Sequence, residues 1–309
     1  MRRNLKMSTL QGSSRVLEND HLILEVDPSS GGSVTRFDYK DINTTHPIFR
    51  RCKQDLSASQ LPLEASCFPL VPYSNRLRHG VFSVNGKVYR HELNCPPEIH
   101  SSHGDGWMRP WEISDSSDSH IEMRLEAFPH QPIKYSAVQS LKLRSDRLSI
   151  SLEVTNADTV LSPFGLGLHP YFHRAAGAQI RCDLKSHWQL DDELLPTNLV
   201  DNPRFLAMKN GLNISDLPTV GAYYSQSTNA DIFWPSTGLK LRLTTIPVQR
   251  HAILWCPEGN DFFCYEPVSH MIDAFNMINH GTENCGVIYL NPGDSHKVIW
   301  DFSIVKLSH

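Results

Sequence analysis

The chain has 309 residues, of which 40% are hydrophobic and 20% are charged, a composition typical of a soluble globular protein. Its formal net charge of −4 argues against nucleic acid or an anionic membrane as the main partner, because both need a basic surface, although a local basic patch could still hold a phosphate. No run of eighteen apolar residues occurs, and the N-terminal segment MRRNLKMSTLQGSSRV lacks the apolar stretch of a secretory signal, so neither a membrane-spanning helix nor export is expected.

Alternation of apolar and polar residues at period two runs through most of the chain and predicts β-strands. The clearest segments are 21–28, 119–128, 135–158, 238–247 and 251–257. An Asn-Gly pair predicts a hairpin over 81–93, and residues 141–154 predict a second hairpin that turns at Ser145-Asp146. The polar stretch SDSSDSH at 114–120 is expected to be a loop between strands.

The sequence contains no long helical periodicity, no alternation of strands with helices and no fixed-period repeat. Twenty prolines and seventeen glycines separate the apolar runs at strand-length intervals, which favours short strands. We therefore expect an all-β fold, a large antiparallel β-sandwich. It should form one domain over residues 16–309, preceded by a loose tail over residues 1–15.

Seven cysteines are spread through the chain without a CxxC pair, at positions 52, 67, 95, 182, 256, 264 and 285. In a chain of this length the odd number and wide spacing predict free thiols, mostly buried, in a reducing compartment. We therefore expect a cytoplasmic protein.

The stretch FGLGLHPYFH at 164–173 combines two glycines with two histidines. It lacks the third glycine of a dinucleotide-binding loop, and neither a P-loop nor a GxSxG motif occurs elsewhere. His169 and His173 have the spacing of a helical zinc site, but Pro170 disfavours a helix through His169. Neither a nucleotide cofactor nor a metal is expected, and a hydrogen-bonded structural role stays open for each histidine.

Two adjacent polar residues, Asn75 and Arg76, stand in PYSNRLRHG at 72–80. The fixed N–H donors of arginine suit hydroxyl and carboxylate oxygens, although an exposed loop arginine is the alternative. A second histidine-containing segment, HSSHGDGW at 100–107, carries His100 and His103. Both segments are candidates for ligand binding.

Glu266 stands in the aromatic run FFCYEPV. Strand parity places it on one face with Phe262 and Cys264, while Phe263 and Tyr265 share the other face. A carboxyl group with such neighbours is expected to be partly desolvated. Its pKa should then be raised toward that of a useful base, unless the strand lies at a sheet edge.

Taken together and in this order, the segments resemble the aldose 1-epimerases, the galactose-mutarotase-like family. The likeness runs from about residue 20 to 300 and is carried by four blocks: SNRLRHGVFSVNGKVYRHELN, HSSHGDGW, GLGLHPYF and the C-terminal region from ADIFWP to FFCYEPVSHMIDAFN. The resemblance implies a mutarotase-type β-sandwich and a small sugar as ligand.

The resemblance also implies roles for individual residues. It makes Glu266 the general base and His169 the general acid of an anomer exchange. It makes sugar ligands of His103, Arg76, Asn75 and Asp231. The loop HGDGWMRPW departs from the common HGG form, so Trp107 and Arg109 are further residues that could reach the site.

Anomer exchange opens the sugar ring and closes it on the other face of C1. The base takes the proton of the C1 hydroxyl while the acid donates to the ring oxygen, and no metal or nucleotide is needed. We expect ionised Glu266 and protonated His169 to perform these steps on a hexose, in a monomer or a homodimer.

Three alternatives stay open. A hexose-6-phosphate 1-epimerase would need added cations, for which Arg78, Arg109 and Arg174 are the candidates. A non-catalytic sugar-binding protein could use the same sandwich. A polysaccharide hydrolase or lyase is the third alternative, but a glycosidase usually needs two carboxyl groups.

Overall fold

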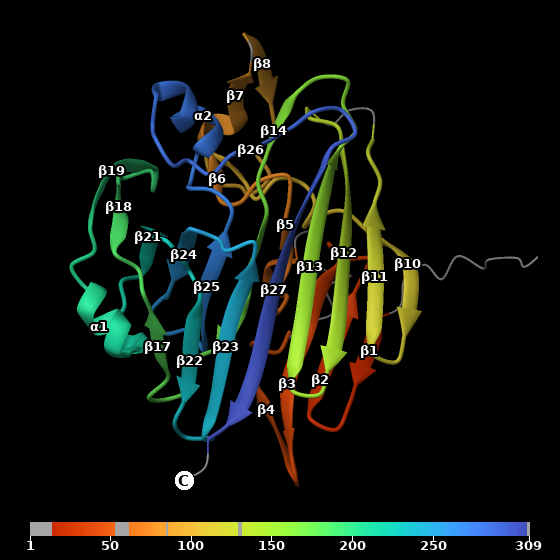
Figure 1. The fold of residues 1–309 in the computed structure, drawn as a ribbon, viewed down its shortest axis with the longest axis vertical. Helices are drawn as coiled ribbons and strands as arrows, with labels where there is room; N and C mark the ends of the chain where they lie inside the picture. The colour runs from red at the N-terminus through yellow and green to blue at the C-terminus, as the bar shows by residue number, and fades with distance from the viewer. Residues whose placement is uncertain (1–13, 53–61, 85, 129–131, 308–309) are drawn as a thin grey trace, which may run out of the picture.

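The computed structural model of the protein describes residues 14–52, 62–84, 86–128 and 132–307. Antiparallel strands make up about half of this part of the chain and helices very little of it, as Figure 1 shows, so the predicted all-β class is confirmed. Of the tail expected over residues 1–15, residues 1–13 lie outside the described residues, and Arg15 already begins the first strand.

The largest sheet has nine strands in the order β10, β11, β12, β13, β27, β23, β22, β17 and β20 (Figure 1). In that order their bounds are Glu112–Ser117, His120–Leu125, Tyr135–Arg144, Arg147–Asn156, Ser295–Lys306, Leu239–Ile246, Ala230–Trp234, Gln179–Cys182 and Leu212–Asn213. Along β12 and β13 every second residue is buried, so one face of this sheet carries the core and the other faces outward.

A second sheet has the order β19, β18, β21, β24, β25, β15 and β5, and β16 pairs with β25 beside this path. In that order the bounds are Pro196–Asp201, Ser186–Leu190, Val220–Tyr224, His251–Trp255, Phe262–Val268, Gly167–Leu168 and Pro69–Leu70, with β16 at Tyr171–His173. All seven residues of β25 are buried, which means that this strand is covered on both faces.

The N-terminal strands form a four-stranded sheet of β1 (Arg15–Glu18), β2 (Leu22–Asp27), β3 (Ser33–Asp41) and β4 (Thr44–Pro47). Three further pairs are β14 (Ser162–Phe164) with β26 (Ile288–Leu290), β6 (Arg76–Leu77) with β9 (Ser101–Ser102), and β7 (Val81–Val84) with β8 (Lys87–Arg90). The helices are α1 (Phe205–Asn210) and α2 (Ala274–Met277), with short 3₁₀ turns at Pro62–Glu64, Arg78–Gly80, Ile214–Asp216 and Ile278–His280.

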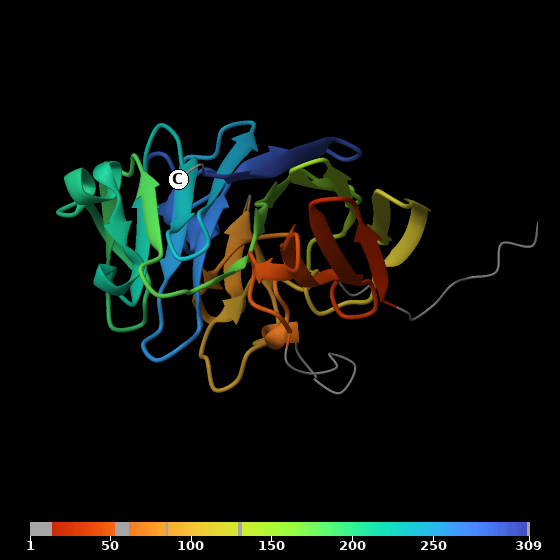
Figure 2. The same cartoon turned by 90° about the horizontal axis from the view of Figure 1, so that it is seen from below.

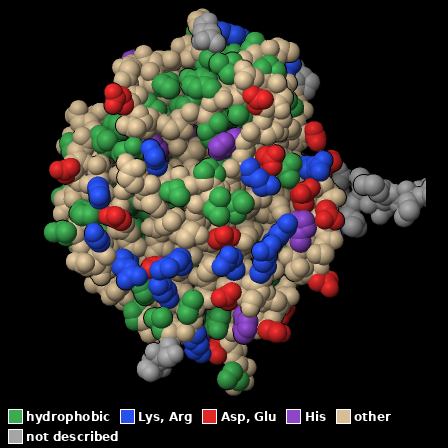
Figure 3. Space-filling view, viewed as in Figure 1, with side chains coloured by type: hydrophobic (Ala, Val, Ile, Leu, Met, Phe, Trp, Pro, Cys, Tyr) green, Lys and Arg blue, Asp and Glu red, His purple; other side chains and the backbone are tan. Residues whose placement is uncertain are grey.

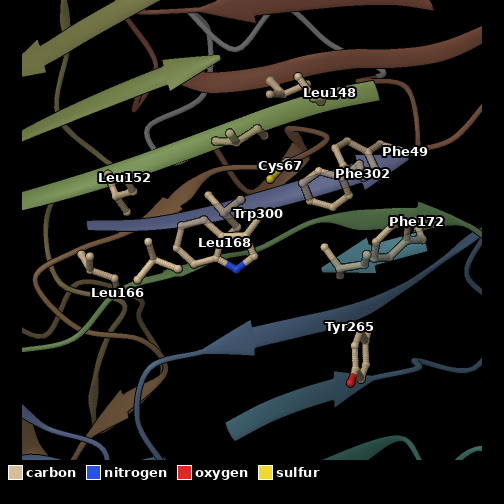
Figure 4. Close-up of a cluster of buried hydrophobic side chains, with 14 of the residues drawn as sticks. Phe49, Cys67, Leu148, Leu152, Leu166, Leu168, Phe172, Tyr265, Trp300 and Phe302 are labelled. Atoms are coloured by element: carbon tan, nitrogen blue, oxygen red, sulfur yellow. The ribbon is translucent and has the colours of Figure 1, made fainter. Parts of the chain in front are cut away.

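The main core fills the space between the nine-stranded sheet and the two sheets that lie against the same face of it (Figure 2). Phe49, Phe172 and Phe302 meet there, and the ring of Phe49 lies 5.3 Å from that of Phe172 and 5.4 Å from that of Phe302 (Figure 4). The indole N–H of Trp300 donates to the carbonyl of Pro267 at 2.9 Å, which ties β27 to β25. A separate buried cluster covers the opposite face of β25 and includes Phe68, Trp107, Tyr171, Trp188 and Phe262.

Both predicted hairpins are confirmed. Strands β7 and β8 pair from Val81–Arg90 to Val84–Lys87, with residue 85 outside the described residues. Strands β12 and β13 pair along their whole length to Arg144–Arg147 around Ser145-Asp146.

The prediction of a loop at 114–120 is wrong. Residues up to Ser117 belong to β10, only 118–119 form a turn, and His120 begins β11. This strand lies at the edge of the nine-stranded sheet and nearly all of it is exposed. With no buried face, it lacks the apolar alternation from which a strand is recognised.

All seven cysteines are free, and five of them are buried, as predicted. Within the described part of the chain, helices are too short and too polar to cross a lipid bilayer.

Candidate active site

The site is built around Glu266 on β25. The parity predicted from the sequence is confirmed: Phe263 and Tyr265 belong to the main core, while Phe262 and Cys264 belong to the cluster on the other face. Glu266 shares that second face and is 1% exposed. Burial raises the pKa of its carboxyl group well above the ordinary value of 4.5, as predicted.

His169 reaches Glu266 because the strands on both sides of it are held by β25. Gly167 of β15 pairs with Val268, and Tyr171 of β16 pairs with Cys264. The two residues between these strands, 169–170, therefore lie alongside Glu266. The Nε2 atom of His169 is 3.6 Å from Oε1 of Glu266, and the backbone N–H of His169 donates to the carbonyl of Phe68 at 3.0 Å.

The imidazole of His169 packs against two aromatic rings. Its ring centre lies 4.7 Å from that of Phe68 and 4.6 Å from that of Tyr171, on which it is stacked at 21°. The guanidinium of Arg50 lies 3.6 Å from the centre of the Tyr171 ring. Burial, followed by the nearby charges of His103 and Arg50, lowers the pKa of His169 well below 6.5.

Two hydrogen bonds join His103 and Asn75. The N–H of Asn75 donates to Nδ1 of His103 at 3.0 Å, and the N–H of His103 donates to the carbonyl of Asn75 at 2.9 Å. Because Nδ1 accepts a hydrogen bond, the neutral ring carries its proton on Nε2. The ring centre lies 5.2 Å from that of His169, and burial together with Arg76 lowers the pKa of His103 to about 3.

Arg76 follows directly, on the short strand β6. One guanidinium nitrogen lies 3.4 Å from a carboxylate oxygen of Glu98, which is itself largely exposed. The Nε atom of Arg76 is buried and has no hydrogen-bond partner among the described residues. The structure therefore brings five of the six predicted residues together: Glu266, His169, His103, Asn75 and Arg76.

Asp231, the sixth, does not lie with them. It is on β22 of the nine-stranded sheet, where its neighbours Ile232 and Ala230 face the main core and Asp231 faces outward. Since Glu266 lies on the far face of the other large sheet, the core separates the two carboxyl groups. The carboxylate of Asp231 is occupied by Arg242 at 2.8 Å, Arg181 at 2.5 Å and Lys240 at 3.2 Å. The prediction that Asp231 binds sugar at this site is therefore corrected.

Trp107 is fully buried and forms a wall of the site. It is stacked on Phe68 at 5.1 Å, and its N–H donates to the carbonyl of Gly104 at 3.1 Å. Arg109 turns another way: it donates to the carbonyl of Glu126 at 2.8 Å and lies over the ring of Phe128 at 4.2 Å.

The other two arginines considered for phosphate are also engaged. Arg174 donates to the carbonyl of Pro257 at 3.0 Å. Arg78 is surrounded by three carboxylates, those of Asp191 at 3.9 Å, Glu193 at 3.6 Å and Asp273 at 3.8 Å.

Sequence reasoning missed two features of the site. Arg50 and Phe68 lie outside the motifs and reach His169 only through tertiary packing, so no local signal identifies them.

Cys264 was assigned from the sequence only to a face of its strand, with no role in the site. The side chains of His169, Cys264 and Glu266 present potential metal ligands within 4.8 Å of one another, and His173 is not part of this group. Burial and Glu266 raise the pKa of the Cys264 thiol well above its ordinary value, which disfavours the thiolate that a soft metal needs.

An antiparallel sandwich with a buried carboxyl–imidazole pair beside a second histidine and an arginine is the arrangement implied by the family resemblance. The profile of the aldose 1-epimerase family matches residues 16–303, and the chain belongs to this family.

Similar proteins occur among known sequences and solved structures. The uncharacterized protein YphB of Escherichia coli K12 is 28% identical over 285 residues, which cover 89% of this chain and 93% of YphB. A crystallised protein of Escherichia coli K12 superposes with a TM-score of 0.84 at 26% identity, covering 96% of this chain and all of the other. A galactose mutarotase-like protein from Clostridium acetobutylicum shares the fold, with a TM-score of 0.79 at 18% identity and coverage of 97% and 99%.

Proposed function

We propose that the protein is an aldose 1-epimerase that interconverts the α and β anomers of a hexose. The observation that carries this proposal is the buried pair of Glu266 and His169, 3.6 Å apart. Each side chain keeps one buried atom, Oε2 of Glu266 and Nδ1 of His169, without a hydrogen-bond partner among the described residues. Buried polar atoms are normally satisfied, so these two are suited to groups of a bound ligand.

The pair holds one proton in either of two arrangements. Ring opening begins with the carboxylate of Glu266 and the imidazolium of His169, and it ends with a carboxylic acid and a neutral imidazole beside the open-chain aldehyde. Burial raises the pKa of Glu266 and lowers that of His169, so it favours the second arrangement. The desolvated site thus stabilises the protonation state that accompanies the aldehyde, and closing the ring on the other face of C1 restores the first arrangement.

The other residues are suited to orientation. The Nε2–H of His103 and the unpartnered Nε–H of Arg76 are donors for hydroxyl oxygens of the sugar, and both residues belong to short segments fixed by backbone hydrogen bonds. Fixed donors convert binding energy into orientation of C1 and the ring oxygen toward the acid–base pair.

A free hexose is favoured over its 6-phosphate. Carboxylates already offset the charges of Arg78 and Arg109, and the guanidinium of Arg174 is turned to the carbonyl of Pro257, so these candidates offer a phosphate dianion little uncommitted charge. A non-catalytic sugar-binding protein is disfavoured because binding alone requires no buried acid–base pair. The free thiols support a cytoplasmic location, since they persist in a reducing compartment.

Polarimetry of pure α-anomers tests the proposal. Freshly dissolved α-glucose, α-galactose and their 6-phosphates should be compared with and without protein. The expected result is accelerated mutarotation of a free hexose that is lost in Glu266→Gln. Sugar binding without anomer exchange would instead support the non-catalytic alternative, and faster turnover of a 6-phosphate would support the phosphohexose alternative.

A further inference from the structure

A second site lies far from Glu266, on the outward face of the nine-stranded sheet. An open cavity of about 350 Å³ is bordered by β17, β22 and β23 and by Lys209 of α1. Figure 3 shows basic side chains gathered on the part of the surface that carries these strands. The hydrogen-bond donors that line the cavity are Arg181, Lys209, Asn229, Arg242 and Thr244.

Asp231 holds two of these donors, Arg181 and Arg242, in place. Cross-strand register places Arg181, Asp231 and Arg242 side by side in one row across β17, β22 and β23. Two nitrogens of Arg242 donate hydrogen bonds to the carboxylate, at 2.8 and 3.2 Å, whereas Arg181 donates from one nitrogen. A guanidinium has five N–H donors, so both arginines are held in place and still have donors to offer.

The charges around the cavity do not cancel. Arg181, Lys209 and Arg242 line it, and Lys240 joins them on Asp231, whereas the lining contains only two carboxylates, Asp183 and Asp231. Four cations against two anions leave an excess of two positive charges on a chain whose formal net charge is −4. The cations depress the pKa of Asp231 to about 2, so its charge persists at neutral pH and continues to hold the arginines.

We propose that this cavity binds an anion that carries a phosphate group. A phosphate monoester has a charge of about −1.5 to −2 near neutral pH, which matches the local excess, and its oxygens accept charge-assisted bonds from several directions. A carboxylate, with one charge and two oxygens, would use fewer of the donors on three surrounding elements. The site is separate from the acid–base pair, and its existence does not depend on the proposed epimerase activity.

Titration calorimetry with inorganic phosphate tests the site, first at low ionic strength and then at 0.15 M salt. The wild-type chain should show one saturable site that weakens as salt rises. Arg181→Gln and Lys209→Gln should each weaken binding at least tenfold. The matched control is Lys297→Gln, which removes one charge from the same sheet beside Glu153 and should leave binding unchanged. Lys297 precedes Ser303, the residue opposite Arg242, by six positions on β27, or about 20 Å along the strand.

Glu266→Gln serves as the second control and should bind phosphate as the wild type does. Titration with glucose 6-phosphate identifies the source of the phosphate. Tenfold tighter binding than inorganic phosphate would indicate a phosphorylated metabolite, and equal binding would indicate free phosphate. Absence of saturable binding, equal weakening by Lys297→Gln, or loss of binding in Glu266→Gln would each overturn the proposal.

Discussion

Replacing Glu266 by glutamine separates the chemical role of its carboxyl group from its effect on folding. Glutamine has nearly the same shape but can neither accept nor carry the catalytic proton. General acid–base catalysis by one group contributes about 10²–10⁴-fold, so mutarotation should fall by that factor, or about 2.7–5.4 kcal/mol in activation free energy. Retention of most of the polarimetric rate would show that Glu266 is not the base.

The same variant should be more stable than the wild type above pH 5. A carboxyl group whose pKa is raised in the folded state stabilises most when it is protonated in both states, and this contribution is lost as pH rises from 4.5 toward the folded pKa. One proton corresponds to about 1.4 kcal/mol per pH unit, so the stability gap between Glu266→Gln and wild type should widen by up to about 2.7 kcal/mol from pH 5 to pH 7.

Urea unfolding followed by circular dichroism at pH 5, 6 and 7 measures this gap. Glu153→Gln is the matched control because it makes the same chemical change on the outward face of the nine-stranded sheet, beside Lys297. The difference in free energy of unfolding between Glu153→Gln and wild type should change much less with pH. If the gap for Glu266→Gln stays flat, the carboxyl group ionises freely in the folded protein, and the inference that burial favours its neutral form is refuted.

Four further outcomes are expected. His169→Asn should lower kcat by about 10²–10⁴-fold with little change in KM, and an effect on KM alone would reduce His169 to a binding residue. Arg76→Ala should raise KM by about tenfold and affect kcat less, whereas an unchanged KM would leave Arg76 with a structural role only. Asp231→Asn should leave mutarotation unchanged. It should lower the free energy of unfolding by only about 1 kcal/mol, since the arginine partners of Asp231 are half exposed. A loss of activity would contradict the placement of Asp231 on the outward face. The pH profile of kcat/KM should be flat through neutrality. Activity should fall in acid as His169 becomes protonated with its lowered pKa, because no base then remains, and in alkali as Glu266 ionises with its raised pKa, because no acid then remains. A fall in activity centred at or above pH 6.5 on the acid side would contradict this order of pKa values.

The alternation of apolar and polar residues predicted strands correctly where at least one face of the strand is buried. Period-two alternation located β11, β12, β13 and β23, because successive side chains point to opposite faces and only one face is covered. It also located β2 and β24, in which nearly all residues are buried. The same alternation failed at β10, since a strand exposed on both faces needs no apolar residues.

The candidate site was predictable for residues that carry motif chemistry and not for those that support them. Asn75, Arg76, His103, His169 and Glu266 stand in distinctive segments and meet in space. Arg50 has no such segment. It matters because its guanidinium lies on Tyr171, which in turn is stacked on His169, and this arrangement exists only after two distant parts of the chain have packed together.

The sequence by itself determined the strand periodicity, the side of β25 on which Glu266 points and the ordered motifs of the family. These are local properties, since the alternation of Cβ atoms along a strand is built into the backbone. Only the tertiary structure decided that His169 lies 3.6 Å from Glu266, through the pairing of β15 and β16 with β25, and that Asp231 faces away from both. Which face of a strand is covered, and by which sheet, depends on contacts between residues far apart in the chain, and no local pattern contains that information.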